Sequence, residues 1–313
     1  MRIRRRALFA WAAGLIAGCG GDGDDGAVIT ISTPSGSSLL TTPTVAPTSA
    51  PPPEIVTSTD SIFQAGASVV SVIGDLSAGT ITFLNRTYQL TKGARSYFAV
   101  IPADADDPVG THPMKVDFVL KNGSKGSMPY QLTIRKTTWT VDAITVGPQL
   151  APLLDPKVTA SELALLRGVY SRYTPEKLWD GPWVLPVGGD ITTRFGEERS
   201  YNGAPVSGHH SGTDLGAAAG TPVGATNAGR VAMARQVQLR GNMVIIDHGG
   251  GLFSGYAHMS SFAVAEGEMV AQGDPLGFVG STGLSTGAHL HWEMSAGGVL
   301  VDPYRFTDGS NGF

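Results

Sequence analysis

Five residues in the last third of the chain place the strongest constraint on how it can fold. They stand in three short runs, and they are His210, Asp214, His258, His289 and His291. Histidine and aspartate are ligands that Zn²⁺ takes in catalytic sites, where three protein ligands leave one position for water. Four of the seven histidines in the chain fall in these runs. The sequence therefore predicts a fold that brings the three runs together around a zinc ion.

The spacing within the runs supports such a site. Side chains alternate between the two faces of a strand, so His289 and His291 should point the same way and Leu290 the other. One of the two imidazoles can then bind metal while the other reaches the water. Between His210 and Asp214, Gly212 permits the tight turn that brings an imidazole and a carboxylate together.

These runs resemble the lysostaphin-type (LytM-like) zinc endopeptidases, a family of bacterial cell-wall hydrolases. That family carries an H-x-x-x-D motif, a Y-A-H segment, and an H-L-H motif between a G-S-T-G turn and an aromatic residue with Glu. All stand here in that order: His210–Asp214, Gly255–His258, Gly280–Gly283 and His289–Glu293. The likeness covers about Val187 to Phe306. It is specific because three motifs match in order, together with their flanks.

The resemblance implies one Zn²⁺ per chain, with His210, Asp214 and His291 as ligands. It leaves His258 and His289 to orient the water, take its proton and stabilise the oxyanion, without deciding which is the base. The implied reaction is hydrolysis of peptide crosslinks in peptidoglycan, at D-alanyl–meso-diaminopimelate bonds if the host is Gram-negative. The main alternative is a LytM-type binding domain that activates a cell-wall amidase without catalysis. A third is a protease acting on exported proteins.

Other polar residues near the runs are expected to be structural. We expect His112, His209 and His248 to be structural or surface residues, with His209 facing solvent and His248 ending an apolar strand before a glycine turn. Asp247 and Glu293 should lie at strand ends or face outward rather than bind metal. For the stretch that holds Arg199, Tyr201 and Asn202, lining a substrate groove and a structural role are equally compatible with the sequence.

The first 18 residues predict export. Four arginines in the first six residues precede an apolar run, Ala7–Ala17, that is too short to span a bilayer. The following Ile16–Cys19 resembles a lipobox, and Cys19 is the only cysteine of the chain. We expect Cys19 to be lipidated, with Gly20 favouring the outer membrane, facing the periplasm, as the place in the cell envelope. An ordinary secretory signal peptide is the alternative.

The net charge limits the classes of partner that the chain can bind, and the composition of one segment predicts a tether. Without residues 1–18 the basic count falls from 22 to 18 against 26 acidic residues, which leaves a net charge of about −8. Such a charge argues against nucleic acid as a partner. Residues 19–60 are rich in Gly, Ser, Thr, Pro and Ala without apolar periodicity, which predicts a disordered tether.

The rest of the sequence predicts a mainly β protein. Short alternating runs over residues 61–148 favour a small β-sandwich-like domain. The sequence predicts that residues 149–186 form a helical connector. Its helix should start at a capping box, Thr159–Glu162, and run to about Arg172. An antiparallel β peptidase domain over residues 187–306 and a tail, 307–313, complete the chain.

The sequence leaves the role of the N-terminal domain open. The family habit of covering the groove with an upstream segment suggests intramolecular occlusion, with Lys177–Trp183 as a connector that permits release. Binding glycan, or spacing the enzyme from its tether, is equally compatible with the sequence.

Overall fold

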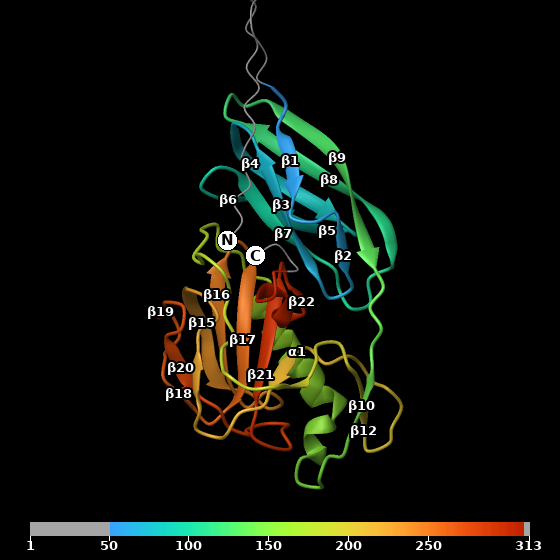
Figure 1. The fold of residues 1–313 in the computed structure, drawn as a ribbon, viewed down its shortest axis with the longest axis vertical. Helices are drawn as coiled ribbons and strands as arrows, with labels where there is room; N and C mark the ends of the chain where they lie inside the picture. The colour runs from blue at the N-terminus through green and yellow to red at the C-terminus, as the bar shows by residue number, and fades with distance from the viewer. Residues whose placement is uncertain (1–50, 310–313) are drawn as a thin grey trace, which may run out of the picture. The chain divides into compact units, whose positions relative to one another are not determined.

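The computed structural model describes residues 51–309 of the chain (Figure 1), and these residues lie in one compact unit. The predictions for the signal peptide, for Cys19 and for the first part of the tether fall outside the described residues. Within the described part, no helix is long and apolar enough to cross a membrane. The mainly β architecture predicted from the sequence is confirmed.

Two sheets make up the N-terminal domain. The first has the order β1-β3-β7-β6, with β1 Glu54–Thr57, β3 Ala67–Ile73, β7 Tyr97–Pro102 and β6 Thr91–Lys92. The second has the order β2-β9-β8-β4-β5, with β2 Ser61–Phe63, β9 Lys125–Arg135, β8 Gly110–Leu120, β4 Leu76–Phe83 and β5 Arg86–Gln89. Neighbouring strands are antiparallel except β2 and β9.

Alternating side chains join these two sheets into a sandwich. In β8, Met114, Val116 and Phe118 are buried while the residues between them are more exposed. They share a core with Val70 of β3 and Ile101 of β7, from the opposite sheet. The period of two in the sequence thus creates one apolar face on each sheet, and the faces pack together.

Strand β1 corrects the predicted boundary of the tether. Glu54–Thr57 was included in the disordered segment 19–60, yet it pairs with β3 from Glu54 opposite Ile73 to Thr57 opposite Val70. Its Ile-Val-Thr core is β-branched, which favours an extended backbone. The folded part of the chain therefore begins at or before Glu54.

The predicted helix exists, but it starts earlier than the expected capping box. It comprises α1, Pro156–Tyr170, and follows a 3₁₀ turn, η1, Ala151–Leu154. Asp155 is its N-cap, because its carboxylate accepts a hydrogen bond from Lys157 N at 2.8 Å. Pro156 suits the first helical position, where no amide hydrogen is needed. Thr159–Glu162 therefore lies inside the helix, and Glu162 is buried.

The C-terminal domain is built on an eight-stranded sheet. Its main path is β11-β13-β21-β17-β16-β15-β19, with β22 beside β21. The strands are β11 Ile191–Thr193, β13 Thr213–Leu215, β21 Leu290–Ala296, β17 Leu252–Met259, β16 Asn242–Gly249, β15 Gly229–Gln236, β19 Met269–Val270 and β22 Val299–Val301. All pairs are antiparallel, as predicted.

Smaller elements complete the C-terminal domain. A three-stranded sheet has the order β14-β20-β18, with β14 Pro222–Gly224, β20 Pro275–Phe278 and β18 Ser261–Phe262. A 3₁₀ turn, η2, Pro303–Phe306, follows β22. Strand β10, Val141–Ile144, lies in the range given to the N-terminal domain, yet it pairs in parallel with β12, Glu198–Tyr201. The predicted boundary at residue 148 therefore does not separate two independent sheets.

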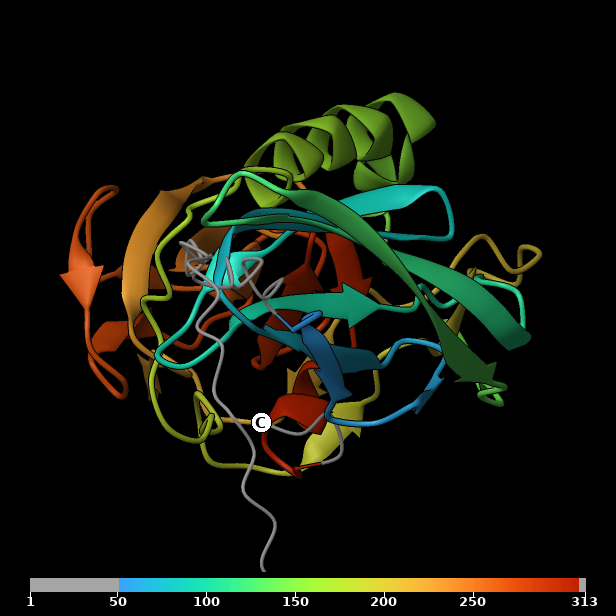
Figure 2. The same cartoon turned by 90° about the horizontal axis from the view of Figure 1, so that it is seen from above.

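Helix α1 covers one face of the eight-stranded sheet, so residues 149–186 are more than a connector. Its buried Leu166, Val169 and Tyr170 pack with Met243 of β16 and Phe253 of β17. Figures 1 and 2 show the helix running along one side of the C-terminal strands. The other face packs on the small sheet through a separate core. The helix is thus an integral layer of the C-terminal fold.

A shared apolar cluster also links the two domains. Phe98 and Val100 of β7 pack with Trp183, Met294 and Phe306. Trp183 belongs to the segment predicted as a releasable connector, and it is only 3% exposed. The two β domains are therefore joined by a buried hydrophobic interface, and this segment is part of it.

Candidate metal centre and active site

Three predicted ligands converge at the junction of two strands. Asp214 on β13 stands opposite His291 on β21, and His210 lies just before β13. Asp214 Oδ1 is 2.8 Å from His291 Nδ1 and 3.1 Å from His210 Nε2. The two nitrogen atoms are 2.9 Å apart. His210, Asp214 and His291 form the group of potential metal ligands within the described residues, and all three are buried.

Hydrogen bonds on the outer side of each imidazole fix which nitrogen faces the centre. His210 Nδ1–H donates to the carbonyl oxygen of Arg194 at 2.9 Å, which leaves Nε2 with a lone pair. His291 Nε2–H donates to Glu293 Oε1 at 3.0 Å, which leaves Nδ1 with a lone pair. Such outer contacts orient metal-binding histidines in general.

The donor set fits a zinc ion. In the tautomers that these outer bonds favour, two nitrogen lone pairs and a carboxylate oxygen face one another, so this point attracts a cation. Without a metal ion, a ring hydrogen of His210 or His291 can bond Asp214 Oδ1 instead. Ligands about 2.1 Å from a tetrahedral zinc stand roughly 3.4 Å apart, so the observed 2.8–3.1 Å needs only a small widening. The remaining position of a tetrahedral site would be open to water.

The other two predicted histidines lie beside this cluster. The His258 ring, near the end of β17, is 4.8 Å from the His289 ring and 5.7 Å from the His291 ring. His258 Nδ1–H donates to the Thr282 carbonyl at 2.7 Å, and His289 Nδ1–H donates to the Gly287 carbonyl at 2.9 Å. Each therefore keeps a free lone pair on Nε2. His289 Nε2 is 3.7 Å from Asp214 Oδ1.

The backbone at His258 is unusual. Its φ of +59° lies in the left-handed region, which side chains larger than glycine rarely adopt. A residue held there is costly for the fold, and such residues concentrate at functional sites. The Thr282 contact and this backbone angle together set the direction of the imidazole.

Burial and charge separate the protonation behaviour of these groups. Burial lowers the pKa of His210 to about 4 and that of His258 to about 3. Burial also acts to lower the pKa of His291, but hydrogen bonds to Asp214 and Glu293 outweigh it and raise that pKa. Burial opposes ionisation of Asp214, yet hydrogen bonds from His210 and His291 hold its pKa well below the usual range. The site therefore has an ionised aspartate and neutral His210 and His258 at neutral pH.

Glu293 contacts a candidate ligand, which the sequence interpretation did not predict. It was expected at a strand end or facing outward, but it is fully buried on β21 and contacts His291. Alternation along the strand could have found it, because Glu293 is two residues after His291 and lies on the same face. Its carboxylate also accepts from Arg240 Nε at 2.7 Å and Tyr170 Oη at 2.7 Å.

Arg199 lies at the rim of the cluster. Its Nη2 is 3.6 Å from Asp214 Oδ2 and its Nη1 is 3.4 Å from Asp142 Oδ2 of β10. Asn202 has a structural contact, because its Oδ1 accepts from Val146 N at 2.8 Å. Tyr201 pairs with Ile144 at the end of β12. Arg199 thus touches a candidate ligand, whereas Asn202 and Tyr201 hold β12 against β10.

The remaining histidines stand outside the cluster, and one of them, His209, differs from expectation, whereas His248 lies at the end of β16 as expected. His209 does not simply face solvent: its Nδ1 contacts the Gly196 carbonyl at 2.8 Å and its Nε2 contacts Asp106 Oδ1 at 3.2 Å. His248 is fully buried, with Nδ1 2.7 Å from the Ala228 carbonyl and Nε2 2.7 Å from Ser254 Oγ. His112 Nε2 contacts the Pro108 carbonyl within the N-terminal domain.

Asp247 lies near the end of β16, which is one of the two positions expected for it. Instead of facing outward it is buried, and it accepts hydrogen bonds from Thr174 Oγ1 at 2.5 Å and Gly249 N at 2.8 Å. These bonds tie the end of β16 to the segment after α1. Asp247 is therefore structural, and it is not part of the ligand group.

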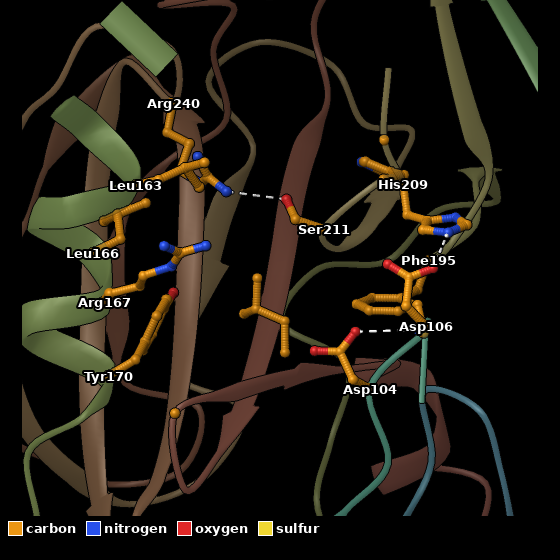
Figure 3. A pocket seen from close by; sticks show the side chains of 15 residues that line it. Asp104, Asp106, Leu163, Leu166, Arg167, Tyr170, Phe195, His209, Ser211 and Arg240 are labelled. Carbon is orange, nitrogen blue, oxygen red and sulfur yellow. Dashed lines mark hydrogen bonds and ion pairs between the residues drawn. The ribbon is translucent and has the colours of Figure 1, made fainter. Parts of the chain in front are cut away.

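A cavity of about 270 Å³ lies next to His210 (Figure 3). Leu163, Arg167 and Tyr170 of α1 form one wall. The opposite wall, with Phe195 and His209, includes Asp104 and Asp106 from the N-terminal domain. Ser211 lies between the walls, and its Oγ accepts a hydrogen bond of 3.0 Å from Nη2 of Arg240, which lies on the side of α1. Helix α1, the strands of the C-terminal domain and the N-terminal domain thus meet beside the candidate metal centre.

Comparison with known proteins places this site in a family. Residues 208–303 match Peptidase family M23. The DD-carboxypeptidase/endopeptidase Mpg of Neisseria meningitidis is 46% identical over 94 residues, which is 30% of this chain and 22% of that protein. The peptidoglycan DD-endopeptidase ShyA of Vibrio cholerae is 32% identical over 140 residues, 45% of this chain and 30% of that protein.

A solved structure extends the likeness beyond the matched segment. A crystal structure from Pseudomonas aeruginosa, described as a peptidase M23, superimposes with a TM-score of 0.54 at 25% identity. The superposition covers 78% of the chain described here and 94% of the Pseudomonas aeruginosa chain. The shared fold therefore includes more than the 96 residues from 208 to 303.

Fold and site together define a metallopeptidase-type domain. Residues 208–303 match peptidase family M23, a metallo-endopeptidase family, and the resemblance predicted from the sequence is confirmed. The aligned segments span less than a third of the length of the two curated relatives.

Proposed function

We propose that this protein is a zinc-dependent endopeptidase that hydrolyses peptide crosslinks of peptidoglycan. One observation carries the proposal: the lone pairs of His210 and His291 converge with the carboxylate of Asp214, beside two imidazoles that keep a free Nε2. In this assignment His210, Asp214 and His291 hold one zinc ion. The ion would polarise the scissile carbonyl and make water more acidic.

The chain's own residues then handle the proton. His258 is neutral at neutral pH because burial lowers its pKa to about 3, so its Nε2 can accept a hydrogen bond or proton. His289 offers a second Nε2 on the same side. One imidazole takes the proton of the attacking water and passes it to the leaving amine. The other, through the lone pair on its Nε2, accepts a hydrogen bond from the water and orients it.

The name of ShyA, a peptidoglycan DD-endopeptidase, supports peptidoglycan as the substrate, and Mpg is named a DD-carboxypeptidase/endopeptidase. On this basis we assign the D-alanyl–meso-diaminopimelate bond as the crosslink that is cut. The alternative is a domain that activates a wall amidase without cutting. An active enzyme is favoured over the activator because the cluster contains all three candidate ligands and both imidazoles that can take a proton.

Digestion of purified crosslinked muropeptides tests the proposal. The zinc-loaded full-length chain should convert dimers to monomers, with mass spectrometry placing the new carboxyl terminus on D-alanine. His258→Ala should lose this activity while it retains zinc, and His112→Ala, far from the cluster, should behave as the wild type. A wild-type protein that holds zinc, leaves every muropeptide intact and stimulates an amidase would support the activator instead.

We also propose that the protein is anchored by a lipid on Cys19, at the outer membrane facing the periplasm. The support is the lipobox-like Ile16–Cys19 and the absence of any other cysteine. Cys19→Ala should release the protein to the soluble periplasmic fraction or leave it unprocessed. Fractionation and processing identical to the wild type would leave a plain secretory signal.

Occlusion of the site by the N-terminal domain is a further part of the proposal. Asp104 and Asp106 line the cavity beside His210, and Asp106 contacts His209, so the sandwich reaches the edge of the site. Asp106→Ala should open this contact and speed cleavage of small crosslinked peptides. Equal rates for the variant and the wild type would favour a spacer or glycan-binding domain.

A further inference from the structure

Helix α1 brings two polar residues to the same sheet face as His291. Tyr170 is 3% exposed and Glu162 is 4% exposed, although a helix surface usually directs such groups to water. Both precede the segment 208–303 that matches the peptidase family. We infer that Glu162 and Tyr170 are positioning residues for the candidate ligand His291, acting through Arg240 and Glu293.

The shorter path runs through Tyr170. Its hydroxyl donates to Glu293 Oε2 at 2.7 Å, while Glu293 Oε1 accepts from His291 Nε2 at 3.0 Å. The two oxygens of one carboxylate are thus held from opposite sides. Because the carboxylate cannot rotate without losing the phenol, the imidazole that it orients is also fixed.

The longer path runs through Arg240. Glu162 accepts from Arg240 Nη1 at 3.2 Å and from the backbone amides of Leu239 and Arg240 at 2.6 and 3.1 Å. Arg240 then donates to Glu293 Oε1 through Nε at 2.7 Å. Its Nη2 also donates to Ser211 Oγ, next to His210. The helix thereby fixes the arginine that holds the carboxylate beside the metal ligand.

A glycine on the neighbouring strand makes this approach possible. Gly255 of β17 stands directly opposite Glu293 of β21. A Cβ atom at Gly255 would lie 2.5 Å from Tyr170 Oη and 2.9 Å from Met243 Cε. The missing side chain is therefore the space that the phenol occupies. Gly255 belongs to the Gly-Tyr-Ala-His run recognised in the sequence, and this contact gives it a specific role.

The chemistry explains why the arrangement matters for metal binding. A ligand imidazole whose outer N–H donates to a carboxylate keeps one tautomer and one ring orientation, and it becomes a stronger donor. Loss of such outer contacts typically weakens metal affinity or activity about 10-fold to 100-fold. Here the outer contact depends on a helix that lies outside the matched segment.

The test measures metal binding rather than hydrolysis, because the inference rests on the proposed metal site. The full-length protein is compared as wild type, Tyr170→Phe and Glu162→Gln. Tyr173→Phe is the matched control, since the Tyr173 hydroxyl bonds Thr91 Oγ1 of the N-terminal domain at 2.9 Å. Zinc affinity comes from competition with a chromophoric chelator, and ligand geometry from the visible absorption of the Co²⁺-substituted protein.

We expect Tyr170→Phe and Glu162→Gln to weaken zinc binding by about tenfold and to alter the cobalt absorption bands. Tyr173→Phe should leave both unchanged. The melting temperature of each metal-free protein separates this effect from a general loss of stability. If either α1 variant cannot be purified, Gly255→Ala, which displaces the phenol from the opposite side, should weaken zinc binding in the same way.

Affinities and cobalt spectra equal to the wild type in both α1 variants, with only melting temperatures lowered, would overturn the inference. A wild type that binds zinc but cuts no muropeptide would overturn the proposed hydrolysis and leave this inference intact. Failure of the wild type to bind zinc would overturn both.

Discussion

Arg240 carries a strong prediction about stability. Its side chain is buried and lies between Glu162 and Glu293, at 3.2 Å from the first carboxylate and 2.7 Å from the second. Arg240→Met keeps a long apolar chain but removes the cation and its hydrogen bonds. Breaking a buried ion pair from one side costs about 3–5 kcal/mol, because the remaining charge is left without compensation. Two carboxylates are left here, so we expect the upper half of that range.

The pH dependence of the loss follows from Glu293. In the wild type, burial acts to raise its pKa, but Arg240 and His291 hold the pKa well below the usual range. Glu293 therefore adds stability above its unfolded pKa of about 4.3, and this is lost as the pH falls through the folded value. Without Arg240 the burial effect should raise its pKa, so the cost to the variant fades as the pH falls.

Urea denaturation of the metal-free chain, followed by tryptophan fluorescence, measures both quantities. The gap in unfolding free energy between wild type and Arg240→Met should be largest near about pH 8 and shrink towards about pH 5. Arg235→Met is the control, because Arg235 forms a half-exposed pair with Glu266 at 3.3 Å and should cost less than about 1 kcal/mol. A gap for Arg240→Met below about 1 kcal/mol, or one independent of pH, would refute the reasoning.

Three further predictions follow from single sites. Burial lowers the pKa of His248 to about 4 from about 6.5, so folding should lose roughly 3 kcal/mol as the pH falls between these values, and His248→Gln should flatten that slope in urea titrations. Gly196→Ala should lower the free energy of unfolding by about 2 kcal/mol or more in the same assay, because its φ is +83° and the new Cβ would lie 2.0 Å from a ring carbon of Trp139. Gly203→Ala is the control: its φ is also positive but the space around it is open, so it should cost only about 1 kcal/mol. Metal analysis should find His291→Ala depleted of zinc and His258→Ala still loaded.

The sequence predicts the candidate site well because its information is local. His210 and Asp214 are separated by one tight turn, and His289 and His291 by one residue of a strand, so their relative directions follow from backbone geometry. The same rule applied to Glu293 would have placed it beside His291.

Long-range contacts explain what the sequence does not predict. Glu162 meets Arg240 across 78 positions of the chain, and neither residue has a local pattern that signals the other. The helix start was misplaced for a different reason. Asp155 followed by Pro156 is a sufficient start signal, and the Thr159–Glu162 pattern competed with it. Strand β1 was missed because its four residues follow a proline-rich stretch.

The packing of α1 has a consequence for recombination between relatives. A catalytic module transferred from residue 208 onward, where the family match begins, would lose the helix that covers Met243, Phe253 and Ala257. Its Arg240 would then face the recipient protein's residues instead of Glu162. A module that starts at Ala151 carries its own layer. The unit that a chimeric enzyme must inherit intact is therefore longer than the segment by which the family is recognised. Insertions between α1 and residue 208 should lower the stability of this unit.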